Sequence, residues 1–478
     1  MRILHISAEC FPAAKAGGMG DVVGALPIYQ NRKAHISEVV IPKYKLPWLE
    51  KTSFKKVLSG KFRQWNTTIH FEVQIVAEDA LPFTLYTVDI PGKFDRPGIY
   101  GDPQEGWYED EPERFLAFQA AVLHWLLKEK KNPDILHCHD HHTGLIPYLI
   151  KNSPLFDDLK DIPTIFTIHN GEYTGAFEWE KLPLLPPTDP KSHGLLDWNG
   201  QIHPLASAIK CAWHFTTVSQ SYLEDIMDTF HGMEELLRKE RTKATGILNG
   251  IDVDVWDPHK DIYLSHPMKS NDLEAFKNDN KKALLNRFNF NLDYPVISFI
   301  GRLVKEKGAD LLPDLYQRMM YSGVKVAFLV LGSGQTEIEE IFLELKKKYP
   351  GRFDVHIGYD EELAHQIYAG SDFIMMPSRV EPCGLNQMYA MRYGTVPIVR
   401  AIGGLKDTVP DIDDFRTEGR GIQFTYFNLD DAALGIYRAG RLYMQTERFK
   451  NLREKLIDID FSWKTSAEKY LQIYNQYL

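Results

Sequence analysis

The sequence predicts an α/β protein made of two doubly wound domains with parallel sheets. Short apolar runs rich in valine and isoleucine recur along the chain and alternate with helix-like segments, a pattern typical of parallel strands covered on both faces. At 478 residues the chain is longer than one hydrophobic core normally organises. A single sheet containing all of these strands would be unusually wide, so two sheets in two domains are favoured.

The predicted strands fall into two series. The first series lies at residues 2–7, 38–42, 134–139, 164–169 and 214–219. The pattern restarts after residue 245, with strands predicted at residues 245–250, 296–301, 324–332, 353–358, 372–377 and 395–399. Between the two series, "NGIDVDVWDP" mixes turn-forming residues with aromatic ones. We therefore expect an N-terminal domain of residues 1–245 and a second domain that begins at residue 246.

Composition and charge narrow the class of protein. The chain is 44% apolar and 25% charged, which is ordinary for a soluble globular protein. Its net charge of -10 argues against nucleic acid or an anionic membrane as the main partner. The four cysteines form no C-x-x-C pair, no secretory signal peptide is evident, and no apolar run reaches the length of a membrane span. These features predict a cytoplasmic protein.

The first predicted strand is followed by "AECFPAAKAGGMGDVVGALP" (residues 8–27), with Lys15, Gly17 and Gly18 in the turn. Glycines allow a backbone to approach a ligand closely, and Asp21 lies where the following helix favours an acidic residue. A strand, a glycine turn and a helix N-terminus together form a pocket for an anion. The alternative is a tight connection with a solvated lysine.

Two cations follow a strand of the second series. In doubly wound domains, ligands bind beyond the carboxyl ends of the strands. Arg302 and Lys307 in "GRLVKEKG" lie at such an end, and both can turn toward one anion. Two cations near a phosphate can hold a diphosphate and stabilise it as a leaving group. The alternative is a pair of surface cations in the first turn of a helix.

The segment "PSRVEPCGLNQMYAM" (residues 377–391) combines a strand end, an acidic loop and a helix start. Glu381 lies where a carboxylate can meet a sugar hydroxyl or a developing positive charge, and the amides of Gly384 and Leu385 can hold a phosphate. The alternative for Glu381 is an acidic cap of a buried helix. Cys383 is interpreted as a small packing residue, because no His–Asp pair accompanies it to make a nucleophile.

Histidines follow two further strand ends. Those in "HCHDHHTG" (residues 137–144) lack an acidic or cysteine ligand set at metal spacing, so we expect one or two of them, with Asp140, to face a polar substrate. A metal site is the alternative there. His169 precedes an Asn-Gly turn and can donate to a sugar hydroxyl or a phosphate, or it is a satisfied core histidine. "DIDD" (residues 411–414) is interpreted as a surface loop and not as a metal motif.

Aromatic residues complete the predicted site. Tyr100, Trp107 and Tyr108 lie among carboxylates in the turn-rich segment 94–110, a composition that suits polyhydroxylated ligands and also ordinary surface packing. Tyr359 follows a glycine at a strand end and can stack on a planar base.

Taken together, these motifs resemble those of one enzyme family. They read, in chain order, "KAGGMGDVVGALP", "FDRPGIYGD", "HCHDHHTGLIPYL", "TIHNGEYTGAF", "ILNGIDVDVWDP", "GRLVKEKG", "PSRVEPCGLNQMYAMRYGTVPIVRAIGGLKDTV" and "FSW". Over essentially the whole chain they resemble the bacterial glycogen synthases and plant starch synthases, retaining glucosyltransferases that elongate α-1,4-glucan. The resemblance implies a GT-B architecture, in which two Rossmann-like domains face a deep cleft. It also implies that the second domain ends at residue 462 and that a helix in residues 463–478 returns to the first.

The resemblance assigns roles to individual residues. A cation pair would stabilise the departing diphosphate, a histidine would lie near the reacting sugar, and a glutamate would stabilise or orient the sugar cation. The catalytic residues implied in this way are Glu381, His169, Arg302 and Lys307. The implied donor site consists of Lys15, Gly17, Gly18, Asp21, Asn249, Tyr359, Cys383, Gly384, Leu385, Gly403, Gly404 and Leu405. The implied acceptor contacts are Tyr100 and Asp140.

Three positions depart from the family's usual motifs. Ala16 and Met19 replace the threonine and leucine of K-T-G-G-L-G-D-V, and His141 replaces the tryptophan of H-D-W-H. The charged set is retained, so these departures bear on acceptor handling more than on the reaction. The resemblance predicts retaining transfer of glucose from ADP-glucose to the nonreducing end of an α-1,4-glucan primer, with no cofactor or metal. The alternatives are a related transferase that uses UDP-glucose or a small sugar acceptor, and an inactive glucan- or nucleotide-binding homologue.

Overall fold

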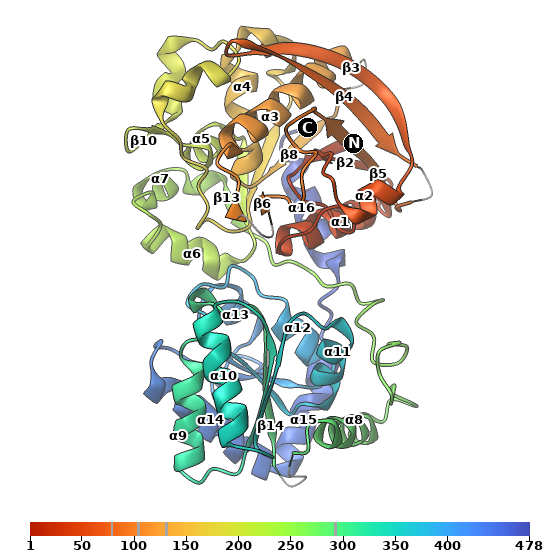
Figure 1. Cartoon of the computed structure of the whole chain (residues 1–478), viewed down its shortest axis with the longest axis vertical. Coiled ribbons are helices and arrows are strands. Elements are labelled where there is room, and N and C mark those ends of the chain that lie inside the picture. Colours follow the sequence, from red (N-terminus) through yellow and green to blue (C-terminus); the bar gives the residue numbers. More distant parts are fainter. Residues whose placement is uncertain (78–79, 103–105, 130–131, 291–293) are drawn as a thin grey trace. The chain divides into compact units, whose positions relative to one another are not determined.

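The computed structural model describes residues 1–77, 80–102, 106–129, 132–290 and 294–478. The chain divides into two compact units (Figure 1). Unit 1 comprises Met1–Val218, Leu223–Ile247 and Trp463–Leu478, and unit 2 comprises Ser219–Tyr222 and Leu248–Ser462. Each unit is built around a largely parallel sheet flanked by helices, so the predicted α/β fold class is confirmed.

Within the described residues, the main sheet of unit 1 has nine strands in the order β13-β12-β9-β8-β1-β2-β5-β4-β3. The strands from β13 to β5 in this order run parallel to one another. Their bounds are β1 Arg2–Ile6, β2 Ile36–Pro42, β5 Thr84–Asp89, β8 Ile135–His139, β9 Thr164–Ile168, β12 His214–Thr217 and β13 Ala244–Gly246. At the far edge, β3 (Phe54–Gln64) and β4 (Thr67–Val76) form an antiparallel hairpin.

The sheet of unit 1 differs from the sequence prediction in two ways. It contains β3, β4 and β5, which were not predicted, and it includes β13. The sequence pattern does not indicate β3, because exposed and more buried side chains alternate along it and leave no continuous apolar run. The expectation that residues 245–250 begin the second domain's strands is wrong. β13 pairs in parallel with β12 and so belongs to the sheet of unit 1.

Helices cover the sheet of unit 1, and one of them comes from the far end of the sequence. α16 (Trp463–Tyr474) packs beside α1 (Gly18–Asn31), as Figure 1 shows. Trp463 and Tyr470 of α16 share a buried apolar cluster with Val22 and Leu26 of α1 and with Ile3 of β1. The other α-helices assigned before residue 245 are α2 Pro47–Lys51, α3 Glu111–Lys128, α4 Ile146–Asn152, α5 Pro204–Cys211, α6 Gln220–Asp228 and α7 Glu234–Lys239.

The sheet of unit 2 has six parallel strands among the described residues, in the order β16-β15-β14-β17-β18-β19. The strands are β14 Val296–Ile300, β15 Ala327–Gly332, β16 Phe353–Ile357, β17 Phe373–Met376, β18 Val396–Arg400 and β19 Ile422–Phe424. The helices are α8 Leu273–Arg287, α9 Leu312–Tyr321, α10 Thr336–Lys348, α11 Glu361–Gly370, α12 Asn386–Arg392, α13 Gly403–Thr408, α14 Leu429–Met444 and α15 Thr446–Ile457. Inside this unit, the buried Asp372 carboxylate pairs with Lys281 at 2.6 Å and with Arg453 at 2.7 Å.

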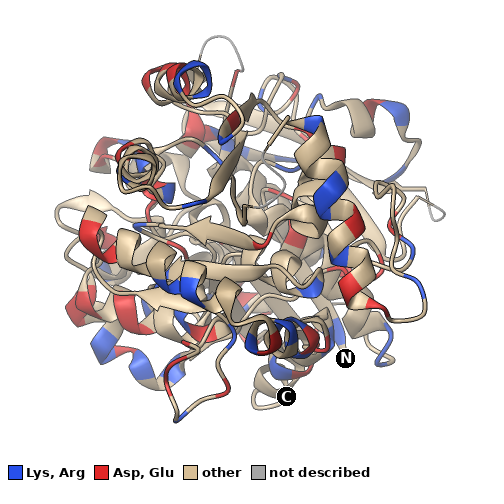
Figure 2. Cartoon of the chain, turned by 90° about the horizontal axis from the view of Figure 1, so that it is seen from below, with Lys and Arg blue, Asp and Glu red and all other residues tan. Residues whose placement is uncertain are grey.

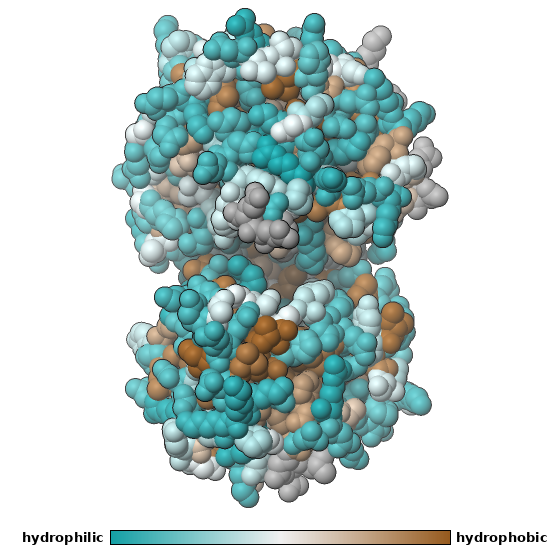
Figure 3. Space-filling model, viewed as in Figure 1, coloured by the Kyte–Doolittle hydropathy of each residue, from teal (hydrophilic) through white to brown (hydrophobic). Residues whose placement is uncertain are grey.

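The surface carries charges of both signs. Acidic and basic residues alternate along the helices in Figure 2, and the face shown in Figure 3 is mainly hydrophilic, with small groups of apolar residues. None of the helices in the described part of the chain has both the length and the apolar character needed to cross a bilayer.

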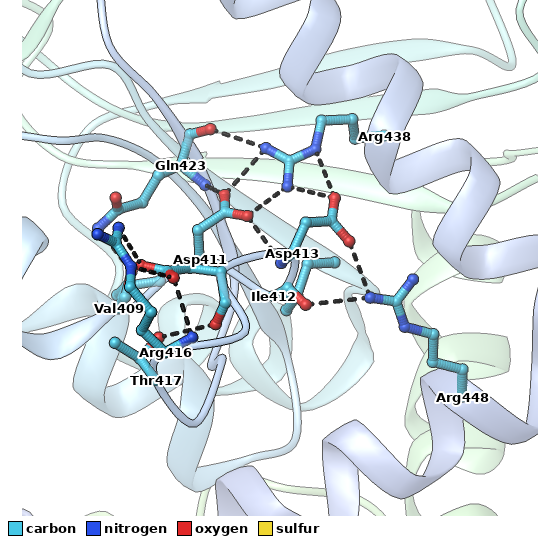
Figure 4. A network of polar contacts seen from close by, with 10 residues as sticks. Val409, Asp411, Ile412, Asp413, Arg416, Thr417, Gln423, Arg438 and Arg448 are labelled. Atoms are coloured by element: carbon cyan, nitrogen blue, oxygen red, sulfur yellow. Dashed lines mark hydrogen bonds and ion pairs between the residues drawn. The ribbon is translucent and has the colours of Figure 1, made fainter.

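The "DIDD" segment contains part of an ion-pair network in unit 2 (Figure 4). The Arg438 guanidinium lies 2.7 Å from the Asp413 carboxylate and also binds Asp411. Arg448 reaches Asp413 from α15 at 2.9 Å. Asp411 and Asp413 therefore have basic partners on α14 and α15, which supports the interpretation of this segment as a structured surface loop.

Candidate active site

In unit 1, the turn after β1 is built around a carboxylate that the sequence analysis did not single out. Glu9 is buried, and its Oε2 accepts hydrogen bonds from the backbone amides of Ala16 at 2.7 Å and Gly17 at 2.8 Å. Two backbone amides of the predicted anion-binding turn are thus occupied by the protein's own carboxylate. The donor contacts expected of Lys15, Gly17 and Gly18 stay a prediction. An acidic residue shortly before a glycine turn was the available sequence signal.

The lysine of this turn is paired as well. Lys15 Nζ lies 2.7 Å from Asp21 Oδ1, and both side chains are partly exposed. Gly17 is the N-cap of α1, whose first turn contains Gly18 and Asp21, so the predicted helix start is confirmed. The lysine and the helix N-terminus give this edge of unit 1 a local positive character that Asp21 partly offsets.

Tyr100 is tied to the same carboxylate. Its hydroxyl donates to Glu9 Oε1 at 2.6 Å, and its ring stacks on His142 with 4.8 Å between ring centroids. Trp107 also stacks on Tyr100, with 6.3 Å between the two ring centroids. Residues 103–105 of the predicted loop 94–110 lie outside the described residues.

Asp140 and His169 meet at the carboxyl ends of β8 and β9. Asp140 Oδ1 accepts a hydrogen bond from the backbone amide of His169 at 2.7 Å, and Asp140 itself has a φ of 54°. Burial raises the pKa of the Asp140 carboxyl to about 7, and the nearby Glu9 charge acts in the same direction. The structure therefore brings Glu9, Tyr100, Asp140 and His169 into one polar group.

The histidines of the segment 137–144 divide into two sets. His137 and His139 are fully buried, where burial holds their pKa values well below the ordinary range. With His5 they bring three ring nitrogens close together, yet hydrogen bonds to protein groups occupy all six nitrogens of these rings. His137 and His139 are therefore hydrogen-bonded core histidines, which leaves His141 and His142 as the histidines of this segment for the predicted substrate contact.

His141 and His142 lie in the turn that follows. Their ring centroids are 3.7 Å apart, and His141 Nε2 lies 2.7 Å from the Glu111 carboxylate at the start of α3. The sequence analysis did not single out Glu111, which lies 30 positions away in the chain. Where the resembled family has a tryptophan, this chain therefore has an imidazole held by a carboxylate.

In unit 2, the predicted cations lie at the carboxyl edge of the sheet, after β14. Lys307 Nζ lies 2.8 Å from Glu381 Oε1, and Ser378 donates to Glu381 Oε2 at 2.8 Å. Arg302 lies 3.3 Å from Glu306, whose carboxylate is also 3.7 Å from Lys307. The predicted Arg302, Lys307 and Glu381 thus form one charged group with Glu306, which the sequence analysis overlooked although it lies within the quoted motif.

Glycines fix the backbone beneath Glu381. A Cβ at Gly403 would lie 2.1 Å from the Glu381 carbonyl oxygen, and one at Gly404 would lie 2.1 Å from the Cys383 carbonyl oxygen. Leu405 is fully buried, so its side chain serves packing. The glycines at these two positions are therefore required by the close approach of α13 to the Glu381 loop.

The remaining residues of the loop 381–385 include a buried cysteine, a glycine and a helix N-cap. Cys383 is buried beside the Asn249 amide, and burial raises the pKa of its thiol to about 12, in line with a packing role. Gly384 has a φ of 72°, a conformation that favours glycine, and Leu385 is the N-cap of α12. Asn249 Oδ1 is buried and without a hydrogen-bond partner among the described residues.

Tyr359 follows β16 and is 87% exposed, with its hydroxyl bonded to Glu361. The ring is therefore accessible and can stack on a flat ligand. It shares the carboxyl edge of the sheet with Arg302 and Glu381, but no contact joins it to them within the described chain.

Comparisons with known proteins agree with this arrangement. Residues 2–239 match a family described as the starch synthase catalytic domain, and residues 280–435 match the family of glycosyl transferases group 1. The glycogen synthase of Flavobacterium johnsoniae is 46% identical over 476 residues, covering 99% of both chains. That of Anoxybacillus flavithermus is 37% identical over 484 residues, covering 100% of this chain and 98% of the relative.

Solved structures show the same likeness. The catalytic domain of starch synthase IV from Arabidopsis thaliana, bound to ADP and acarbose, has a TM-score of 0.88 and 30% identity, with 100% of this chain and 99% of that chain covered. Sucrose-phosphate synthase from Thermosynechococcus elongatus, at 17% identity and a TM-score of 0.63, shares the fold. The full-length likeness to the relatives and the starch synthase structure confirms the predicted GT-B fold class and the predicted enzyme class. This chain belongs to the glycogen synthase and starch synthase family of glycosyltransferases.

Proposed function

We propose that the protein transfers glucose from ADP-glucose to the nonreducing 4-hydroxyl of an α-1,4-glucan, with retention of configuration at the anomeric carbon. The observation that carries this proposal is the full-length similarity to proteins named glycogen synthase, at 46% identity for the one from F. johnsoniae. The ADP bound in the similar starch synthase structure favours an adenine nucleotide as the carrier of the sugar.

The charged group of unit 2 suits the departure of a nucleoside diphosphate. Transfer breaks the bond between the sugar C1 and a phosphate oxygen, and the electron pair stays with the diphosphate. A bond forms between C1 and the acceptor O4, whose proton passes to the departing diphosphate. Arg302 and Lys307 supply the positive charge that offsets it. Glu381, held by Lys307 and Ser378, supplies a negative charge toward the sugar cation. Because side-chain cations serve the diphosphate, the scheme requires no metal or other cofactor.

In unit 1, Tyr100 and Asp140 are the proposed acceptor contacts, and His169 is the proposed contact of the transferred sugar. Their support is that they form one polar group with Glu9 at the edge where β8 and β9 end. We also infer a cytoplasmic location, which fits four free, buried cysteines.

The test is incorporation of labelled glucose into glycogen from ADP-glucose or UDP-glucose, with and without primer, before and after treatment with EDTA. We expect primer-dependent transfer from ADP-glucose that EDTA leaves unchanged. Transfer from UDP-glucose alone would overturn the donor assignment, and transfer to small sugars without primer would favour a small-acceptor enzyme. Loss of activity in EDTA, restored by Mg²⁺, would overturn the proposal that no metal is needed. Nucleotide binding without transfer from either donor would favour an inactive homologue.

A further inference from the structure

A chain of buried side chains leads from His169 into the interior of unit 1. His169 Nε2 lies 2.9 Å from His139 Nδ1, and His139 Nε2 lies 3.0 Å from His5 Nδ1. His5 Nε2 lies 2.9 Å from Oε1 of Gln30 on α1. This series of hydrogen bonds starts directly after β9, passes through the adjacent strands β8 and β1, and ends on helix α1. Each of these side chains is buried.

Gln30 sets the direction in which the hydrogen bonds run. Its Nε2 donates to the Tyr474 hydroxyl of α16 at 3.3 Å, while its Oε1 accepts from Ser37 Oγ at 2.6 Å. A carboxamide oxygen can only accept, so the hydrogen between Gln30 and His5 belongs to His5 Nε2. The amide end of the chain is therefore fixed by contacts with a strand and with the C-terminal helix.

The hydrogen bond from His5 Nε2 to Gln30 Oε1 determines the tautomers of the three histidines. A neutral imidazole has one N–H and one bare nitrogen, so His5 accepts at Nδ1 and His139 must donate from Nε2. His139 then accepts at Nδ1, and His169 must donate from Nε2. The nitrogen that His169 leaves bare is Nδ1, which is buried and has no hydrogen-bond partner among the described residues.

The surroundings keep the imidazoles of His5, His139 and His169 neutral. Burial lowers the pKa of His5 to about 4 and that of His169 to about 3, and it holds the pKa of His139 well below the ordinary range. The His137 ring stacks on His139, with 4.2 Å between ring centroids, and burial lowers the pKa of His137 too. His137 is itself bonded to Tyr474 and Thr167.

We propose that Gln30, acting through His5 and His139, holds His169 in the tautomer protonated on Nε2, so that His169 accepts a hydrogen bond from a sugar hydroxyl through Nδ1. This inference rests on the proposed function, which places His169 beside the transferred sugar. A bare imidazole nitrogen attracts a hydroxyl hydrogen and repels the oxygens of an ionised phosphate. His169 is thereby matched to the sugar and not to the diphosphate, in contrast to the sequence expectation that it donates to either. Gln30, His5 and His139 are positioning residues.

The parent protein tests the tautomer without any substitution. In protein labelled with ¹⁵N-histidine, the His169 ring signals are assigned as those missing from His169→Gln. We expect a protonated Nε2 and a bare Nδ1 at pH 7.5. A proton on Nδ1 would overturn the proposal.

Gln30→Met tests the role of the amide, because it removes the acceptor at His5 with little change in side-chain size. We expect mixed tautomers at His169 and a fall in kcat of about tenfold, the effect of weakening one hydrogen bond in the transition state. In a His169→Ala background the same change should cause no further loss. Gln30→Glu keeps an acceptor at this position and should keep the parent tautomer.

Tyr148→Phe is the matched control, because it removes a hydrogen bond of another buried side chain of unit 1, 2.8 Å long, between Tyr148 of α4 and Ser192. It should leave the His169 signals unchanged. An unchanged tautomer in Gln30→Met, or an equal kcat loss from Gln30→Met in the parent and in His169→Ala, would overturn the proposal. Absence of glucosyl transfer by a parent protein with the expected His169 signals would overturn the proposed function and leave the tautomer assignment standing.

Discussion

Lys307 Nζ lies 2.8 Å from Glu381 Oε1, although the two residues are 74 positions apart in the chain. The proposed leaving-group cation and the proposed essential carboxylate are therefore a coupled pair and do not act separately. Each partner holds the other at the carboxyl edge of the sheet of unit 2.

This coupling predicts non-additive effects of substitution. Lys307→Met and Glu381→Gln should each lower kcat by roughly 10²-fold to 10³-fold, because each disturbs a charge needed as ADP departs. The double variant should be little worse than the poorer single one. Initial rates of glucose transfer to glycogen measure this. If the two losses multiply, the pair is a contact without functional coupling.

Glu306 should weaken donor binding, because its carboxylate lies 3.3 Å from Arg302 and 3.7 Å from Lys307. Glu306→Gln removes this competing negative charge and should lower the KM for ADP-glucose several-fold, by about threefold to tenfold. The effect should shrink when the NaCl concentration is raised from about 50 mM to about 300 mM, because added salt shortens the Debye length and screens the charge of Glu306. Glu344→Gln on α10 makes the same change in net charge at an exposed position and should leave KM unchanged. A KM that rises in Glu306→Gln would mean that this carboxylate supports donor binding.

Asp140 should make the folded protein less stable as the pH rises. Its folded-state pKa is raised from 3.8 to about 7, so folding favours the protonated form. The stability that it contributes is fully present below pH 3.8 and is lost as the pH rises through about 7, by up to about 4 kcal/mol. Asp140→Asn cannot titrate, so the difference in free energy of unfolding between parent and variant isolates this carboxyl. Urea unfolding at pH 5 and pH 8 measures the difference, and a constant value would show that the pKa of Asp140 is not raised.

The Asp372 carboxylate should be essential to the stability of unit 2. It pairs with both Lys281 and Arg453 in the interior, so Asp372→Asn leaves two buried cations without their counter-charge. We expect a loss of about 3–5 kcal/mol in the free energy of unfolding. Glu344→Gln, which breaks an exposed pair with Lys347, should leave the urea midpoint unchanged. Equal midpoints for both variants would show that the buried pairs contribute little.

The sequence predicts most of the parallel strands, because strands such as β1, β8 and β14 are short, buried and largely apolar runs in a sheet covered on both faces. It does not predict the parallel strands β5 and β19. It does not indicate the β3–β4 hairpin, whose alternating pattern belongs to a strand with one exposed face. Local pattern also misleads at residues 245–250, where pairing with β12 decides to which sheet the segment belongs.

For the site, the sequence identifies chemical types and strand ends but not partners. Lys15, Lys307 and Glu381 all appear as candidates, yet the pairings with Asp21 and between Lys307 and Glu381 depend on the fold. The role of Glu9 could not be predicted, because its hydrogen-bond donors are backbone amides of the turn that was interpreted as an anion site. The hydrogen-bond direction along His5, His139 and His169 could not be predicted, because one amide on a distant helix determines it.

The position of α16 has a consequence for how this protein is made. Residues 463–478 leave the ribosome only after all of unit 2 has been synthesised, yet Trp463 and Tyr470 complete the apolar cluster around β1 and α1. The part of unit 1 that is synthesised first therefore exposes this apolar surface until unit 2 and residues 463–478 have been synthesised. A fragment of residues 1–247 expressed alone should be prone to chaperone capture and aggregation, and adding a 463–478 peptide to it during refolding should rescue soluble material.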